Sequence, residues 1–241
     1  MGVTPTDHEP PVALVTGASQ GLGRAVARAL AGRGWIVVAD ARHAAALAEA
    51  LDGLPGAIGV PGDVTDQAHR AELAAVAERL GRLDVLINNA SALGPSPLPR
   101  LREYPLGALR EVFETNVVAP LALVQLLAGR LAAARGVIVN VSSDAAVESY
   151  QGWGGYGSAK AALDQLTSVL GEEERAIACY AFDPGDMRTQ MHQAAFPGED
   201  ISDRPEPETA VPALLRLLDQ RPPDGRYRAA DLTTTPAGVT S

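Results

Sequence analysis

Short apolar stretches alternate with longer stretches of helical period along nearly the whole chain, and this alternation constrains the fold more than any other feature. Apolar runs predict seven strands, at residues 12–16, 35–39, 57–60, 84–88, 136–141, 176–182 and 225–230. The segments between them place apolar residues every three or four positions, as amphipathic helices do. Strands that are apolar on both faces need cover on both sides, so we expect an α/β fold with a doubly wound parallel sheet and helices on both faces.

The chain shows no linker and no internal repeat, so we expect a single domain over residues 1–241. The proline-rich stretch 94–105 is typical of a surface loop, and the polar stretch of about 186–205 is expected to form a lid over the site. Thr65 is expected to cap the helix after the third strand.

Charge and composition exclude several classes of protein. A formal net charge of −9 argues against a nucleic-acid partner. The single cysteine, Cys179, excludes a disulfide framework and a cysteine-based zinc site, and we expect no metal site. Residues 1–11 are polar and no run reaches 18 apolar residues, so we expect no signal peptide, no membrane segment and a cytoplasmic location.

Two predicted helices are unusually apolar, over residues 117–131 and around residues 159–170. A helix that is apolar on all sides must be covered on all sides. A second copy of the chain would supply that cover, so we expect a homo-oligomer, a dimer or tetramer. Cover by loops of the same chain is the alternative.

A glycine-rich turn, Thr16-Gly17-Ala18-Ser19-Gln20-Gly21-Leu22-Gly23, joins the first strand to the first helix. Glycines allow a tight turn and let backbone N–H groups approach a pyrophosphate, whose charge the helix N-terminus favours. The pattern predicts a Rossmann-type dinucleotide site, although a turn that serves packing alone is an alternative. The expected contacts are Gly17, Ser19, Gln20, Gly21, Leu22 and Gly23.

Asp40 follows the second strand, about 20 residues beyond the glycines, where a carboxylate can accept hydrogen bonds from the adenosine ribose. Such a carboxylate would repel a 2′-phosphate, so NAD is favoured over NADP as the cofactor. Arg42 argues the other way, because a guanidinium can pair with that phosphate. A helix-capping role for Asp40 is a further alternative. Asp63 and Val64, after the third strand, are expected beside the adenine.

Tyr156 and Lys160 lie one helical turn apart on one face of a predicted helix, and Ser143 stands at the end of the fifth strand. At this point the sequence resembles the short-chain dehydrogenase/reductase family, in its short single-domain branch. The matching motifs follow the family's order over nearly the whole chain. They are the glycine turn, Asn88-Asn89-Ala90, Asn116, Ser142-Ser143, Tyr156-x-x-x-Lys160 and Pro184-Gly185 with Thr189.

The resemblance implies a catalytic tetrad of Asn116, Ser143, Tyr156 and Lys160. A carbonyl accepts a hydride only if its oxygen is stabilised and protonated, and Tyr156 would supply that proton, or act as the base in the reverse direction. A free phenol has a pKa of about 10, so the ammonium of Lys160 would be needed to favour the phenolate. Ser143 would hydrogen-bond the substrate oxygen, and Asn116 would hold a water.

The resemblance also implies further cofactor contacts and shows where this chain departs from the family. The implied contacts are the backbone of Asn89 and Ala90, together with Tyr156, Lys160, Pro184, Gly185, Met187 and Thr189. There are four departures: Ser91 in place of the usual glycine, Tyr180 in place of asparagine, Asp186-Met187 in place of a β-branched residue, and no glycine pair after the last strand. The change at Ser91 is expected only to tighten the cofactor turn.

We therefore expect an NAD(P)(H)-dependent oxidoreductase that interconverts a secondary alcohol and a ketone, with Tyr156 as acid and base. Trp153 and Tyr150, between the serine and the catalytic tyrosine, suggest a flat or apolar small-molecule substrate. A non-catalytic dinucleotide-binding sensor or scaffold on the same fold is the alternative, and the intact tetrad argues against it.

Lys160 is the only lysine in the chain, since the other nineteen basic residues are arginine. Codon bias alone could leave one lysine anywhere. Its position one turn after Tyr156 favours a specific need for a compact ammonium, which a planar guanidinium does not replace.

Overall fold

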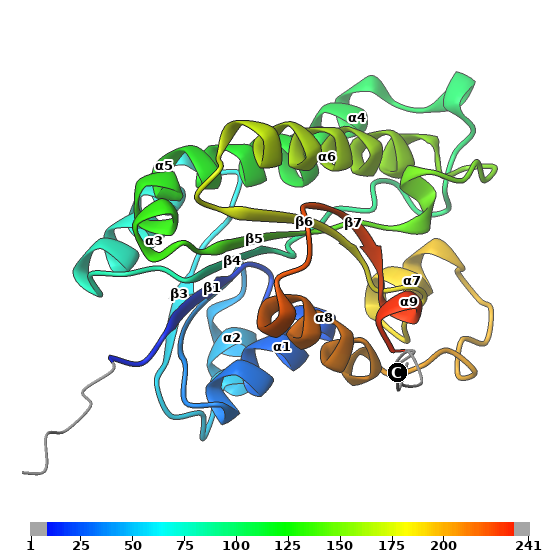
Figure 1. Cartoon of the computed structure of the whole chain (residues 1–241). Coiled ribbons are helices and arrows are strands. Elements are labelled where there is room, and N and C mark those ends of the chain that lie inside the picture. Colours follow the sequence, from blue (N-terminus) through cyan, green and yellow to red (C-terminus); the bar gives the residue numbers. More distant parts are fainter. Residues whose placement is uncertain (1–8, 234–241) are drawn as a thin grey trace, which may run out of the picture.

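A computed structural model describes residues 9–233, which build one seven-stranded sheet between two layers of helices (Figure 1). The strands are β1 (Val12–Val15), β2 (Ile36–Ala41), β3 (Ala57–Pro61), β4 (Val85–Asn88), β5 (Val137–Val141), β6 (Ala178–Asp183) and β7 (Gly225–Arg228). The helices are α1 (Gly21–Gly32), α2 (Ala44–Leu51), α3 (Gln67–Arg79), α4 (Leu106–Phe113), α5 (Ala119–Ala134), α6 (Gly154–Glu173), α7 (Gln190–Ala195), α8 (Val211–Gln220) and α9 (Ala229–Thr233).

The sheet has the order β3-β2-β1-β4-β5-β6-β7, and each neighbouring pair is parallel. From β1 the chain adds β2 and β3 toward one edge of the sheet. It then returns to the other side of β1, where β4 to β7 extend to the opposite edge. This topology confirms the predicted doubly wound fold. It also places a switch point between β1 and β4, where the loops at the carboxyl ends of the strands diverge and leave a crevice.

Alternate residues of each strand feed two separate cores. In β1, Ala13 and Val15 join the core beneath α1, α2 and α8. Val12 and Leu14 join the core beneath α3, α5 and α6. Figure 1 shows these two helical layers on opposite faces of the sheet. The period-2 alternation of strand side chains therefore explains why β1, whose four residues are all buried, is apolar at every position.

The apolar helix predicted at 117–131 is longer and differently shaped than expected. It begins at α4, passes through the π-helical segment η2 (Glu114–Val118) and continues as α5 to Ala134. This run of 29 residues is long and apolar enough to cross a membrane by length and composition. The sequence does not show it as an uninterrupted apolar run, because polar and charged residues occur within it. Leu123 and Leu127 are buried against the sheet, as in a core helix, whereas the outward-facing Leu126 is 50% exposed.

Three of the differences from the predicted elements affect the interpretation of the site or of the chain ends. β2 extends to Ala41, so Asp40 lies inside the strand rather than after it. Asp66 caps α3 by accepting a hydrogen bond from the backbone N–H of Ala68, a role predicted for Thr65. The last strand ends at Arg228, and residues 229–233 turn into α9. The prediction that no signal peptide occupies the N-terminus concerns mainly residues 1–8, which lie outside the described residues.

Candidate active site

The carboxyl ends of the strands border a cleft of about 1620 Å³. It runs from the glycine turn, past the ends of β2, β3 and β4, to the start of α6. The cleft brings together most of the predicted site residues, namely Gly17, Ser19, Gln20, Gly21, Leu22, Asp40, Asp63, Val64, Asn89, Ala90, Ser143, Tyr156, Lys160, Pro184, Gly185, Met187 and Thr189. Gly23 and Asn116 lie behind its wall and shape it indirectly.

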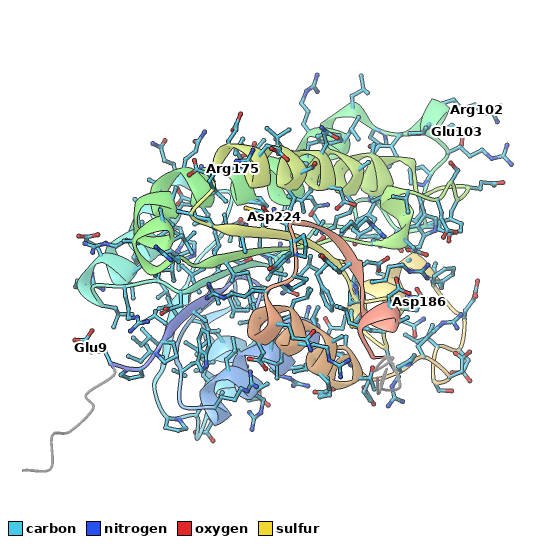
Figure 2. All side chains as sticks on the ribbon, in the orientation of Figure 1. Glu9, Arg102, Glu103, Arg175, Asp186 and Asp224 are labelled. Carbon is cyan, nitrogen blue, oxygen red and sulfur yellow. The ribbon has the colours of Figure 1, made fainter. Side chains whose placement is uncertain are left out.

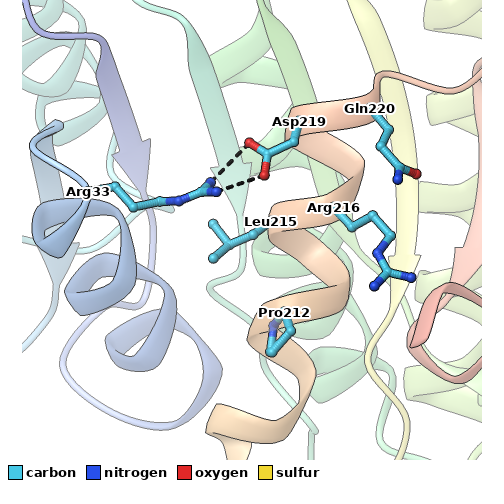
Figure 3. Close-up of a pocket in the computed structure, with 6 residues that line it drawn as sticks. All are labelled: Arg33, Pro212, Leu215, Arg216, Asp219 and Gln220. Atoms are coloured by element: carbon cyan, nitrogen blue, oxygen red, sulfur yellow. Dashed lines mark hydrogen bonds and ion pairs between the residues drawn. The ribbon is translucent and has the colours of Figure 1, made fainter. Parts of the chain in front are cut away.

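A second, smaller hollow lies between α1 and α8 on the outer surface, away from the strand ends (Figure 3). Arg33 and Asp219 face each other across it in a two-pronged ion pair of 2.7 and 3.0 Å. Because these charges neutralise each other, the hollow offers no free catalytic group, and the chemistry is expected in the large cleft.

The glycine turn is packed too tightly to accept side chains. Gly17 and Gly21 have positive φ angles of 66° and 54°. A Cβ on Gly23 would lie 2.4 Å from the carbonyl oxygen of Gly17. The side-chain amide of Asn89 holds the turn by donating to the carbonyls of Thr16 (2.8 Å) and Gly17 (3.2 Å). A turn with bare backbone in front of a helix N-terminus fits a pyrophosphate, so the residues present suit a dinucleotide.

Asp40 does not present its carboxylate to the cleft as the sequence suggested. The side chain is 1% exposed. One oxygen accepts a hydrogen bond of 2.9 Å from the backbone N–H of Gly17, and the other lies 2.9 Å from Nε2 of His69 on α3. Asp40 therefore ties the glycine turn to α3, and the predicted ribose contact does not match its position. This difference arises because the backbone N–H of Gly17 and the imidazole of His69 engage both carboxylate oxygens inside the protein.

Arginine side chains line the adenosine end of the cleft instead. Arg42 follows β2 and Arg24 lies in the first turn of α1, and both side chains are exposed at the cleft. Burial opposes ionisation of Asp63, but hydrogen bonds from Thr65 and the nearby charge of Arg42 lower the pKa of that carboxyl. The entrance to this end of the cleft thus combines one carboxylate with two guanidinium groups.

Lys160 lies beneath Tyr156 on α6, with its ammonium 5.5 Å from the centre of the phenol ring. It is 1% exposed and donates a hydrogen bond of 2.7 Å to the carbonyl of Val141 at the end of β5. Burial lowers the pKa of Lys160 to about 8, although the carboxylate of Asp164, one turn further along α6, opposes that shift. The predicted juxtaposition of an ammonium and a phenol is therefore present.

The side chains of Tyr156 and Ser143 both line the cleft. Burial raises the pKa of Tyr156 to about 12, while the nearby hydroxyl groups of Ser91 and Ser143 act in the opposite direction. Ser143 also donates a hydrogen bond of 2.9 Å to the carboxylate of its neighbour Asp144. In the protein alone, the phenol is thus held in its neutral form, as an acid requires.

Asn116 lies in the π-helical segment η2, completely buried. Its side-chain oxygen accepts hydrogen bonds from the Ser91 hydroxyl (3.0 Å) and the Ala92 N–H (2.8 Å), and its amide donates to the Ala92 carbonyl (2.8 Å). The side chain is therefore occupied within the protein. A water held by Asn116, as predicted, would have to bind its backbone carbonyl, and π-helical turns interrupt the regular bonding of such carbonyls.

Arg226 on β7 connects three parts of the site that the sequence did not associate with it. Its guanidinium donates to the backbone carbonyl of Ser143 (2.9 Å), to Asp183 at the end of β6 (2.8 Å) and to Asp164 on α6 (3.1 Å). Asp183 in turn accepts from the N–H of Gly185 (3.0 Å). This arginine therefore fixes the predicted catalytic serine and the start of the loop after β6.

The predicted lid begins at this loop and lies along the cleft. Thr189 caps the short helix α7 by accepting from the N–H of His192, and its methyl group lies next to the glycine turn at Gly21. Arg188 forms an ion pair with Glu206 at the far end of the segment. Asp186, labelled in Figure 2, also lines the cleft, and one of its carboxylate oxygens lies 3.8 Å from Nδ1 of His192 on α7. The segment thus borders the end of the cleft where Thr189 and Met187 are predicted to contact the nicotinamide.

Comparisons with known proteins agree with this geometry. A family model described as short chain dehydrogenase matches residues 11–200. The chain belongs to the short-chain dehydrogenase family. Bovine L-xylulose reductase is 35% identical over 224 residues, covering 87% of this chain and 89% of that protein. The family assignment makes the protein an oxidoreductase that binds NAD(P).

Solved structures of other short-chain dehydrogenases have the same fold. One from Pseudomonas syringae is 33% identical, with a TM-score of 0.85, over 91% of this chain and 94% of that one. Another, from Shigella flexneri and complexed with NADP, is 26% identical, with a TM-score of 0.82, over 91% and 97%. The seven-stranded sheet and its crevice are therefore those of this short-chain dehydrogenase family.

Sequence reasoning missed several residues that shape this short-chain dehydrogenase site. The sequence marks Ser91 only as a departure from the usual glycine. The hydrogen bond of its hydroxyl to Asn116 depends on the fold, which brings the two residues together. Arg226 could have been noticed as a charge within a predicted strand, where a cation needs a partner. His69 carried no recognisable signal, because only the fold brings α3 beside β2.

Proposed function

We propose that this protein reduces a ketone to a secondary alcohol, or catalyses the reverse reaction, with Tyr156 as the acid and base. The observation that carries the proposal is the cleft itself, because one cleft is lined by the glycine turn, which suits a pyrophosphate, and by Ser143, Tyr156 and Lys160. When bound, NAD(P)H supplies the hydride.

The residues of the chain have distinct roles in this proposal. Ser143 donates to the substrate oxygen after its hydroxyl turns away from Asp144. Tyr156 gives its proton to the same oxygen. Lys160 supplies a positive charge beneath the phenol and so favours the phenolate that remains. The preorganised groups thus stabilise the charge that develops on the substrate oxygen.

We also propose NADP(H) as the preferred cofactor, which reverses the preference expected from Asp40. Both carboxylate oxygens of Asp40 are engaged by Gly17 and His69, so they do not repel a 2′-phosphate at the cleft. Arg24 and Arg42 line that end of the cleft, and guanidinium groups pair well with phosphates. The NADP complex of the Shigella flexneri relative supports this preference.

The substrate end of the cleft favours a ketone with an apolar, flat flank. Trp153 packs edge-on against Tyr156, with 5.7 Å between ring centres, and lies 6.0 Å from Phe196. Leu93 and Met191 belong to the same cluster. Aromatic walls bind flat apolar groups well, so aryl ketones should be better substrates than sugars.

The decisive experiment screens the purified protein with NADPH and NADH against a panel of aryl, alkyl and polyhydroxylated ketones. We expect oxidation of NADPH with at least one aryl ketone, and loss of turnover with retained NADPH binding in Tyr156→Phe. A non-catalytic sensor, the alternative function, would bind the cofactor and show no turnover with any member of the panel.

We further propose that the protein is a homo-oligomer that pairs through α5 and α6. The outward-facing Val118, Leu126 and Val169 are 45%, 50% and 40% exposed, which is a large exposure for apolar side chains on adjacent helices. Light scattering should give the mass of a dimer or tetramer, and Leu126→Glu should reduce it. A monomeric mass for the unaltered protein would contradict the proposal. A cytoplasmic location stays a prediction.

A further inference from the structure

His69 holds the glycine turn from behind, through Asp40. The backbone N–H of Gly17 donates to one carboxylate oxygen of Asp40 (2.9 Å), and the N–H of Ala18 donates to its backbone carbonyl (2.8 Å). The other carboxylate oxygen lies 2.9 Å from Nε2 of His69. Asp40 is 1% exposed and His69 is 5% exposed. A buried pair of side chains therefore sets the position of two N–H groups in this turn.

The imidazole ring of His69 also packs against the end of β3. A Cβ at Gly62, the residue after β3, would lie 2.1 Å from Nδ1 of His69, so the ring occupies space that only a glycine leaves free. Gly62 begins the loop that contains Asp63 and Val64, and both of these residues line the cleft. His69 thus joins the glycine turn to the loop at the adenosine end of the cleft.

The side chains that face His69 are carboxylates. Asp40 on β2 faces Nε2, and Glu72 on α3 lies 3.9 Å from Nδ1. Asp66 at the start of α3 and Asp63 in the loop before it add negative charge nearby. The hydrogen bond to Asp40 raises the pKa of His69, burial acts in the opposite direction, and the charges of the surrounding carboxylates raise the pKa further. These surroundings favour a protonated ring.

The other basic side chains near this pair are directed elsewhere. Arg70, the next residue on α3, donates to a backbone carbonyl of the loop before that helix (2.6 Å). Arg42 is exposed at the cleft. On α5, which packs along α3, Arg130 pairs with a carboxylate near the far end of α3. Within residues 9–233, the one ion pair of Asp40 is with His69.

The charge of Asp40 matters because of what the glycine turn suits. A pyrophosphate would bring its negative charge to the same turn that Asp40 holds. Two anions at one buried turn repel each other more strongly than they would in water, because the protein interior screens charge poorly. A protonated His69 offsets this repulsion, and a neutral His69 does not.

We propose that His69 is a positioning residue whose protonated ring neutralises Asp40 behind the glycine turn, so that binding of a dinucleotide takes up a proton at this pair. The proton comes from the solvent and binds Nδ1, because a carboxylate only accepts and Nε2 already directs its hydrogen to Asp40. The inference needs dinucleotide binding, which follows from the family assignment, and it does not need the proposed reaction.

The test measures proton uptake when NADP⁺ binds, by isothermal titration calorimetry in buffers of different ionisation enthalpy. A fraction of a proton should be taken up by the unaltered protein. The Kd should rise by up to about tenfold as the pH rises above the ordinary histidine pKa of about 6.5. The 2′-phosphate of NADP⁺ also titrates, so each variant is compared with the unaltered protein, and circular dichroism checks the fold at each pH.

Two substitutions should have opposite effects on affinity. His69→Gln keeps a hydrogen-bond donor for Asp40 without a charge, so it should bind NADP⁺ about tenfold more weakly at pH 6 and take up less proton. Asp40→Asn keeps an acceptor for the Gly17 N–H and removes the charge. It should show the same loss of proton uptake, yet bind NADP⁺ more tightly than the unaltered protein at high pH. A purely structural role for the pair would weaken binding in both variants.

Glu72→Gln is the matched control. Glu72 is 63% exposed and lies beside the other nitrogen of the ring, so its loss should leave most of the proton uptake in place. Unchanged proton uptake in His69→Gln, an equal loss in Glu72→Gln, or weaker binding by Asp40→Asn at every pH would overturn the inference. If His69→Gln does not fold, Asp40→Asn decides. Absence of turnover in the unaltered protein would refute the proposed function alone, because the calorimetry needs no turnover.

Discussion

The guanidinium of Arg226 donates a hydrogen bond of 2.9 Å to the backbone carbonyl of Ser143, from a strand at the opposite edge of the sheet from β3. The same group forms ion pairs with the buried Asp183 and the partly buried Asp164. The position of the predicted catalytic serine thus depends on β7, which carries no member of the tetrad.

Removal of this guanidinium should affect both stability and catalysis. Arg226→Met leaves Asp183 and Asp164 without their cation, and we expect a loss of about 2 kcal/mol in the free energy of unfolding. Arg226→Lys keeps the charge but cannot reach three acceptors, so stability should recover more than kcat does. Urea denaturation and steady-state kinetics measure the two effects. Equal kcat in Arg226→Lys and the unaltered protein would show that the contact to Ser143 is unimportant.

Lys160→Arg tests whether the site needs an ammonium. A guanidinium is too wide for a position that is 1% exposed and directed at the Val141 carbonyl. We expect kcat to fall about a hundredfold or more. The control is Arg175→Lys, the opposite exchange at an exposed residue just after α6 that pairs with Glu172. This variant should leave kcat unchanged. Near-normal kcat in Lys160→Arg would make codon bias a sufficient explanation of the single lysine.

The same lysine predicts a pH dependence. Burial lowers its pKa to about 8, below its ordinary value, so the ammonium is lost as the pH rises through that point. Ketone reduction should therefore decline above about pH 8. Asp164→Asn removes the charge that opposes this shift and should move the decline to lower pH. A decline at the same pH in both proteins would assign it to another group.

Asp40 and His69 predict a pH-dependent stability. The hydrogen bond to Asp40 raises the pKa of His69. A group whose pKa is higher in the folded state stabilises the fold below its unfolded pKa, and that contribution is lost as the pH rises through the folded value. His69→Gln does not titrate, so the Tm difference between the two proteins should narrow as the pH rises above the ordinary histidine pKa of about 6.5. A difference that stays constant would contradict the charged pair.

Arg42→Ala tests the cofactor preference. Without this guanidinium, the Kd for NADPH should rise about tenfold while that for NADH changes little. Arg102→Ala removes the same charge from an exposed side chain that does not line the cleft (Figure 2) and should alter neither value. Fluorescence titration measures both. A parallel change for both cofactors would place Arg42 outside the 2′-phosphate site.

The periodicity of the chain was enough to predict the sheet, because parallel strands buried on both faces must be apolar and the crossovers between them must be helical. The motif residues Ser143, Tyr156 and Lys160 were predictable for a similar reason, since helix geometry and strand ends determine their positions. Asp40 was not predictable in the same way. Its role depends on where β2 ends and on His69, which comes from a distant part of the chain. Contacts of that kind, like those of Ser91 and Arg226, depend on side chains brought together only by the fold.

Lys160 offers a way to observe motion in this protein. It carries the only side-chain amine among the 241 residues, and that amine is buried beneath Tyr156, the proposed acid and base. Reagents that acylate amines therefore find no lysine on the outside of the folded chain. The rate at which they label Lys160 measures how often this one position opens to solvent, with no engineered probe, and a bound dinucleotide should slow it.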